Sequence, residues 1–139
     1  MFDSCTSLVE APSLPATTLS DYCYHEMFAH CTSLETAPEL PASTLTYYCY
    51  GGMFWDCTSL TTAPDLLAEK VGSSSYASMF KGCTKLNKVK CLATDISAYD
   101  GLNEWLKDVS ATGTFVKAAN VEWPSGTSGI PEGWAVEEL

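Results

Sequence analysis

The sequence contains no arginine, and no lysine precedes Lys70. Acidic residues outnumber basic residues 17 to 7, which gives the 139-residue chain a net charge of −10. Nucleic-acid binding needs clustered cations that contact the phosphates, so this composition excludes nucleic acid as a partner. No apolar run approaches the roughly 18 residues that a membrane-spanning helix requires, so we expect no membrane span.

An internal repeat dominates the sequence. The dipeptide Met-Phe recurs with the same spacing each time, at Met1, Met27, Met53 and Met79. The first two units, residues 1–26 and 27–52, agree at 16 of 26 positions without an insertion. A fixed period without gaps is typical of a solenoid, in which each unit forms one coil and equivalent residues stack in columns.

The repeat also predicts how each coil is built. Aromatic, thiol, hydroxyl and aliphatic side chains recur in register, beginning with Phe2, Cys5, Thr6 and Leu8. The segment Ser7–Ala11 and its counterparts are the best strand candidates, and successive strands should pair in parallel about 4.8 Å apart. We therefore predict a solenoid with a parallel sheet on one face over residues 1–91. Its 26-residue coils are 1–26, 27–52, 53–78 and, in part, 79–91.

The repeat pattern breaks after Cys91, and residues 92–139 are predicted to form a small α/β C-terminal cap over the last coil. An apolar face of helical spacing is formed by Tyr99, Leu102, Leu106 and Val109. It predicts a helix over about 97–110. Strands are predicted at about 113–118 and 134–137.

At the N-terminal end, Met1 is the first residue of a repeat, and no signal peptide precedes it. We expect a C-terminal piece of a longer protein. The alternative is an intact short protein whose first coil another subunit covers.

The pattern of the seven cysteines indicates a role in core packing and not in catalysis or metal binding. One column contains Cys5, Cys31, Cys57 and Cys83, which predicts a buried ladder of thiols that act as small apolar side chains. The only histidines, His25 and His30, stand near Cys23, Glu26 and Cys31, but there is no CxxC pair and the equivalent positions of later coils do not repeat the cluster. No phosphate-binding loop or GxSxG motif is present. We predict no metal, no cofactor and no catalytic residue.

Positions that differ between coils are free of the core and are therefore candidates for ligand contacts. Most lie on the predicted sheet or just beyond it, and two are aromatic residues at other variable positions. Exposed aromatic side chains are favoured anchors in binding sites. The predicted ligand-binding residues are Glu10, Glu35, Thr36, Glu39, Tyr47, Trp55, Thr61, Thr62, Asp65, Asn87 and Lys88.

The unit MFxxCTSLxxAPxLPAxTLxxxCYxx resembles the leucine-rich repeats of BspA-like bacterial surface proteins. The tail GTFVKAANVEWPSGTSGIPEGWAVEE is similar to C-terminal endings in that group, which is common among gut Bacteroidales. The resemblance implies a right-handed leucine-rich-repeat solenoid displayed at the cell surface, where characterised members bind host matrix proteins or other bacteria. It brings no residue-level ligand motif, and this chain has only about four coils and no export signal.

These observations together predict a non-enzymatic, adhesin-like binding module that presents a rigid repeat surface outside the cell. Its partner would be a host matrix protein, a glycan or another bacterial surface protein. The alternative is a structural spacer, or an end piece of a longer repeat protein that self-associates through an uncapped N-terminal coil.

Overall fold

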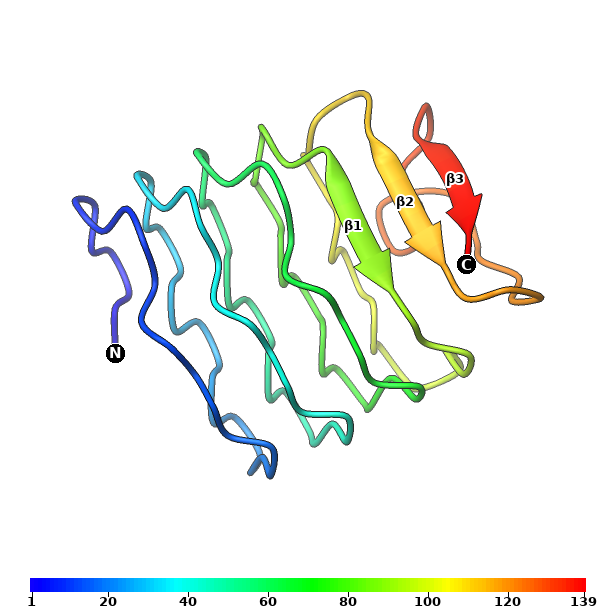
Figure 1. Ribbon diagram of the computed structural model, residues 1–139, viewed down its shortest axis with the longest axis horizontal. Coiled ribbons are helices and arrows are strands. Elements are labelled where there is room, and N and C mark those ends of the chain that lie inside the picture. The colour runs from blue at the N-terminus through cyan, green and yellow to red at the C-terminus, as the bar shows by residue number, and fades with distance from the viewer.

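The computed structural model describes all 139 residues. The chain winds into successive coils that lie side by side along one axis, with the N-terminus at one end and the C-terminus near the other (Figure 1). Three strands form one parallel sheet in the order β1 (Lys88–Cys91), β2 (Thr114–Lys117) and β3 (Ala135–Glu138). On the same side of the molecule, the earlier coils pair with one another through isolated β-bridges, such as the one between Glu10 and Thr36.

The period of the sequence is also the spatial period. The backbone N–H of each of the first three repeat phenylalanines donates to the carbonyl of the methionine that precedes the equivalent phenylalanine of the next coil. This bond runs from Phe28 to Met53 at 2.9 Å and from Phe54 to Met79 at 2.8 Å. In the sheet, Val89 pairs with Phe115, which is again one full period later. The sequence separation between the last two paired strands is shorter than one period: Phe115 pairs with Val136.

The side of each coil away from the strands is a chain of tight turns, which we call the turn face. It comprises residues 20–31, 46–57, 72–83 and 98–109. Every fourth residue there has a positive φ: in the first segment these are Tyr22, Glu26 and His30, at 58°, 52° and 58°. Backbone N–H groups alternate between a carbonyl three residues back and a carbonyl of the next coil. The turn face therefore satisfies its backbone without a helix.

The helix predicted over residues 97–110 is wrong, because the chain contains no helix and this segment is the fourth turn segment. Asp100, Glu104 and Asp108 have φ values of 49°, 52° and 59°, and they follow the matching positions of the third coil by one period. A four-residue turn repeat and a helix share nearly the same apolar spacing, which explains the error. Here the carbonyls serve the previous coil: Phe80 N–H donates to Trp105 O at 3.0 Å. A helix would consume those carbonyls internally.

The other predicted elements can be compared with the observed strands and coils. β2 lies within residues 113–118, and β3 begins one residue later than the predicted strand 134–137. Strand pairing at Ser7–Ala11 is limited to a bridge at Glu10, and the full strand of the fourth coil, β1, starts at Lys88. Coil geometry also continues past Cys91 as far as Asp108, because the positive-φ positions repeat to that point.

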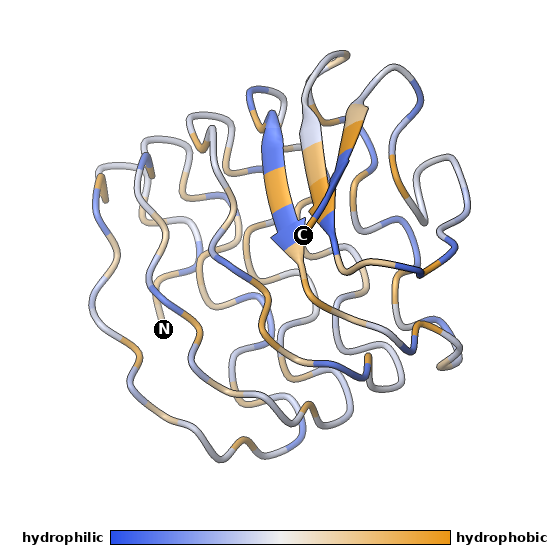
Figure 2. Cartoon of the chain, turned by 45° about the vertical axis from the view of Figure 1, so that its right-hand side comes forward, coloured by the Kyte–Doolittle hydropathy of each residue, from blue (hydrophilic) through white to orange (hydrophobic).

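Columns of stacked aromatic rings form the core between the turn face and the side that carries the strands. The rings of Phe2, Phe28, Phe54 and Phe80 lie 5.5–5.7 Å apart and nearly parallel. A second column joins Tyr24, Tyr50 and Tyr76. Hydrophobic and hydrophilic residues alternate along β1, so its inward side chains join this core (Figure 2). Stacking of equivalent side chains lets each coil bury its apolar residues against its neighbours.

The C-terminal end of the stack is covered by aromatic residues. Trp105 is fully buried, stacks on Trp123 with ring centres 5.8 Å apart, and donates from Nε1 to Gly129 O at 2.9 Å. Phe115 meets Trp123 edge-on at 5.0 Å. At the opposite end Met1 is 85% exposed.

Candidate binding surface on the strand face

Nine of the predicted ligand-binding residues lie together on the side that carries the strands, which we call the strand face. Bridges between Glu10 and Thr36 and between Thr62 and Lys88 place these four side chains in one row across the coils. The other members lie beside that row. All nine are exposed: Glu10, Glu35, Thr36, Glu39, Thr61, Thr62, Asp65, Asn87 and Lys88.

Two successive side chains per coil are exposed on this face, and the pairing of the first two coils is irregular. The N–H groups of Glu35 and Thr36 both donate to Val9 O, at 2.8 and 3.4 Å. Two residues thus oppose one, as in a β-bulge, which breaks the in–out alternation of a regular strand. Each coil exposes two successive variable side chains here, where simple alternation would expose one.

A groove of about 470 Å³ runs between the second and third coils at the end of this row. Its volume lies within the roughly 300–1,000 Å³ of pockets that hold small ligands. Glu39 and Asp65 supply its charges, and Leu67, at 40% exposure, supplies an accessible apolar side chain. The remaining lining is Ala37, Pro38, Leu40, Pro41, Ala63 and Pro64.

Proline gives this groove rigid walls, because its ring fixes φ and removes a backbone donor. The first two coils contain a Pro-x-x-Pro pair, whereas the third has Pro64 followed by Leu67. The groove lies where this replacement occurs. Prediction from the sequence identified the two carboxylates but not the prolines or Leu67, although the exchange of proline for leucine within the repeat is a visible signal.

The charge of the strand face changes along the stack. Glu10, Glu35 and Glu39 make no ion pair, whereas Asp65 lies 3.6 Å from Nζ of Lys90. Both members of that pair are partly exposed, so their attraction contributes little to stability. The first two coils are therefore acidic, and basic side chains begin with Lys70 in the third coil.

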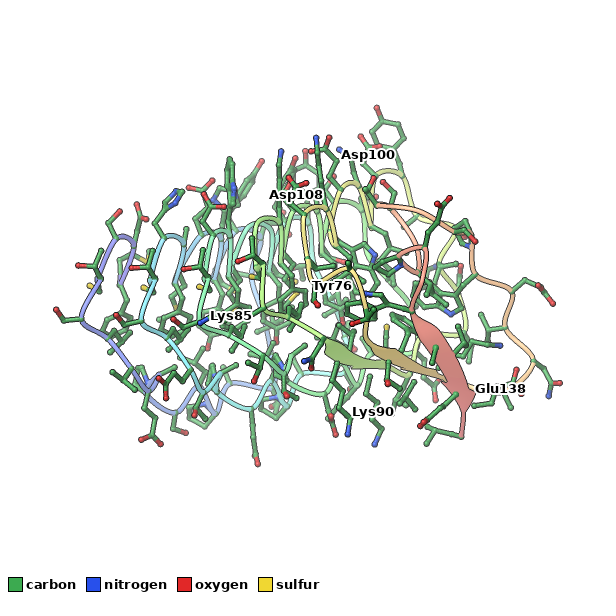
Figure 3. The ribbon with its side chains drawn as sticks, turned by 90° about the horizontal axis from the view of Figure 1, so that it is seen from above. Tyr76, Lys85, Lys90, Asp100, Asp108 and Glu138 are labelled. Carbon is green, nitrogen blue, oxygen red and sulfur yellow. The ribbon has the colours of Figure 1, made fainter.

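Tyr47 and Trp55 lie on the turn face, apart from the other nine residues. Tyr47, 44% exposed, packs edge-on against Tyr22 and Tyr48 at 5.4 and 4.9 Å. The half-buried ring of Trp55 has Nζ of Lys81 5.4 Å from its centre. Figure 3 shows the separation of the two faces, with Asp100 and Asp108 on the turn face and Lys90 on the opposite side.

The titratable core does not resemble a nucleophilic site. Burial raises the pKa of the Cys57 and Cys91 thiols to about 12 and that of Cys49 to about 11, so these thiols stay protonated at neutral pH. The histidines face different carboxylates: Nδ1 of His30 lies 3.3 Å from Asp56, and His25 lies near Glu26. No three side chains of the metal-ligating types converge.

The structure contains no helix with the length and apolar character needed to span a membrane.

Comparison of the chain with models of protein families, with curated proteins and with solved structures finds no match. The candidate surface is therefore defined by its own geometry: a rigid, acidic strip of exposed side chains beside a groove.

Proposed function

We propose that the protein is a non-enzymatic, surface-displayed binding module built as a leucine-rich-repeat solenoid, and that it holds a protein or glycan ligand on its strand face. One observation carries this proposal: nine variable side chains lie on one face beside a groove of about 470 Å³, which two of them line. The resemblance to BspA-like repeats supports the bacterial, extracellular location. A preformed surface limits the entropy lost on binding, so many modest contacts can add up to useful affinity.

The charges of the strand face favour a polypeptide that carries lysine or arginine. Glu10, Glu35 and Glu39 have no cationic partner within the chain. A basic segment would approach an acidic strip faster and with fewer wrong partners than a neutral one. Leu67 and the prolines of the groove would contact the aliphatic parts of the same segment.

A binding screen against immobilised matrix proteins and a glycan panel tests the proposal, with the monomeric state first confirmed by light scattering. We expect a saturable hit whose affinity falls at least about tenfold in the double variant Glu35→Gln/Glu39→Gln, because charged contacts govern recognition there. The matched control is Asp100→Asn, an exposed carboxylate on the turn face, which should bind normally. No hit from a folded monomer, or equal binding by the double variant, would contradict the proposed strand-face site.

The N-terminal edge of the stack bears on the second candidate, a spacer or an end piece that self-associates through its first coil. The carbonyl oxygens of Asp21, Cys23 and His25 accept no hydrogen bond, whereas their equivalents one coil later accept bonds from Tyr22, Tyr24 and Glu26. The first coil thus presents a row of free acceptors. Two identical ends would place acceptors against acceptors, so self-association there would lack backbone pairing on the turn face.

A further inference from the structure

The turn face contains a groove that the strand-face site does not involve. It has a volume of about 190 Å³ and lies over Gly52, between Tyr48 and Trp55. Glu26 and His25 border it on the first coil, and Asn103 borders it on the fourth. Ala77 and Ser78 complete the lining.

The groove exists because two middle coils carry small residues where the outer coils carry large ones. One column contains His25, Gly51, Ala77 and Asn103, and the next contains Glu26, Gly52, Ser78 and Glu104. In both columns large polar side chains stand at the ends and small residues in the middle. The result is a depression two coils wide, which corresponds to about 10 Å at the usual spacing between paired strands.

Backbone geometry does not explain the glycine at position 52. Its φ is +60°, but Glu26, Ser78 and Glu104 carry side chains at the equivalent position with φ between 52° and 54°. Space does explain it: a Cβ atom on Gly52 would lie 2.9 Å from Cγ of Glu26 and 3.8 Å from Cε3 of Trp55. Gly52 therefore keeps open the floor between a carboxylate and an aromatic ring.

Gly51 has a related role at the side wall. A Cβ atom there would lie 2.5 Å from Cδ1 of Tyr48 and 3.3 Å from Cδ2 of His25. The missing side chain lets the Tyr48 ring lie against the backbone, where it stacks in parallel on Tyr22 with ring centres 5.3 Å apart. The two glycines thus shape a groove with an aromatic wall on each side.

The electrostatics of the groove disfavour ions of either sign. Anions would meet Glu26, while Glu104 nearby is already bound by Lys81 at 2.7 Å and by Lys107 at 3.2 Å. Cations would compete with Lys81, whose ammonium already lies 5.4 Å from the centre of the Trp55 ring. A neutral ligand avoids both penalties.

The hydrogen-bonding groups of the groove suit a ligand with several hydroxyls. The hydroxyl of Ser78 and the side-chain amide of Asn103 make no hydrogen bond within the chain, and Glu26 has only His25, at 3.7 Å, beside it. These groups together offer donors and acceptors beside aromatic rings. Such a combination of apolar walls and a few polar groups is typical of small-ligand sites, and the volume is below the roughly 300 Å³ of drug-sized pockets.

We infer that this groove is a second binding site, independent of the strand face, and that it takes a single neutral pyranose ring, such as the terminal sugar of a glycan. The apolar face of the ring lies against Trp55 or Tyr48. The sugar hydroxyls bind Glu26, Ser78 and Asn103.

Saturation-transfer difference NMR and calorimetric titration test this inference, with the methyl glycosides of glucose, galactose, mannose and N-acetylglucosamine as probes. We expect saturable binding of at least one glycoside. Gly52→Gln should weaken it at least about tenfold, because its side chain fills the floor of the groove. A glutamate already occupies this position in two other coils, so the variant should fold. Trp55→Ala should weaken binding similarly, since it removes an aromatic anchor.

The matched control is Tyr99→Ala, which removes a 79% exposed aromatic side chain outside the groove and should leave sugar binding unchanged. Glu35→Gln/Glu39→Gln on the strand face should also retain it, so the two proposed sites can fail separately. The inference is overturned if the folded protein binds no glycoside, or if binding persists in both Gly52→Gln and Trp55→Ala. Displacement of the sugar by Nα-acetyl-lysine methyl ester would show that the groove selects cations instead.

Discussion

The thiol of Cys57 donates a hydrogen bond to the carbonyl oxygen of Phe28, 3.1 Å away in the preceding coil. The same bond recurs between the neighbouring coils, from Cys31 to Phe2 and from Cys83 to Phe54, each at 2.9 Å. Every such carbonyl also accepts a backbone N–H of its own coil. The repeated cysteine is therefore a buried donor that joins one coil to the next, in addition to filling space.

Replacement of Cys57 by alanine should destabilise the protein by about 1–3 kcal/mol, because it leaves a small cavity and removes a hydrogen bond. Cys5→Ala is the matched control, since Cys5 occupies the same column but is exposed. Its effect should lie within about 0.5 kcal/mol. Urea unfolding measures both changes. Equal free energies of unfolding for the two variants would contradict the proposed role of the ladder.

Thiol labelling should divide the seven cysteines into two classes. Cys5 is exposed and Cys23 is partly exposed, whereas the other five are buried and unpaired. At pH 8 a thiol reagent should modify these two within minutes and reach the remaining five only after unfolding, because buried, protonated thiols are poor nucleophiles. Mass spectrometry of the labelled, digested protein identifies the sites. Fast labelling of four or more cysteines in the folded protein would refute the buried ladder.

Stability should fall in alkaline solution. Burial raises the pKa of the Cys57 and Cys91 thiols from 9.0 to about 12, so the folded protein retains protons that the unfolded chain releases. The contribution of these thiols to the free energy of unfolding should therefore be fully present below the unfolded pKa of 9.0 and decrease as the pH rises through 9 toward 12. Urea midpoints at pH 7, 9 and 10 measure the decrease. Cys57→Ala should show a shallower decrease, and an identical slope would assign the effect to other groups.

The repeat made the columns of the core predictable. Because Phe2 and Phe28 occupy the same position of successive repeats with matching surroundings in the sequence, their stacking follows from the period alone. The exposed positions of the strand face follow in the same way, since a residue that varies between coils, such as Glu35 or Thr61, cannot be required by the core.

Features that depend on geometry between coils were not predictable from the period. The bulge at Val9 O arises from pairing and leaves no mark in the hydropathy pattern. The groove over Gly52 depends on which coils carry small residues in one column, and this becomes meaningful only once neighbouring coils are seen to touch. The separation of Trp55 from the strand face likewise required the path of the whole coil.

The turn segment at residues 98–109 provides the sharpest test of this backbone, because a helix and a four-residue turn repeat respond oppositely to glycine. Asp108 is exposed and has a φ of 59°, and its equivalent in the preceding coil is Gly82. Asp108→Gly should therefore leave stability unchanged or raise it by up to about 1 kcal/mol, since glycine adopts positive φ without strain. In a helix interior the same change would instead cost roughly 0.3 kcal/mol, because glycine has a lower helix propensity than aspartate.

The control for this prediction is Asn103→Gly in the same segment, where φ is not positive. Glycine gains nothing there and loses more conformational entropy on folding, so this variant should be destabilised, by up to about 0.5–1 kcal/mol. If the turns form, urea unfolding should show that the two substitutions change the free energy of unfolding of the parent protein in opposite directions or by clearly unequal amounts. Similar losses in both would indicate that the segment is helical in solution. The ladder that joins it to Ser74, Tyr76 and Ser78 would then be absent as well.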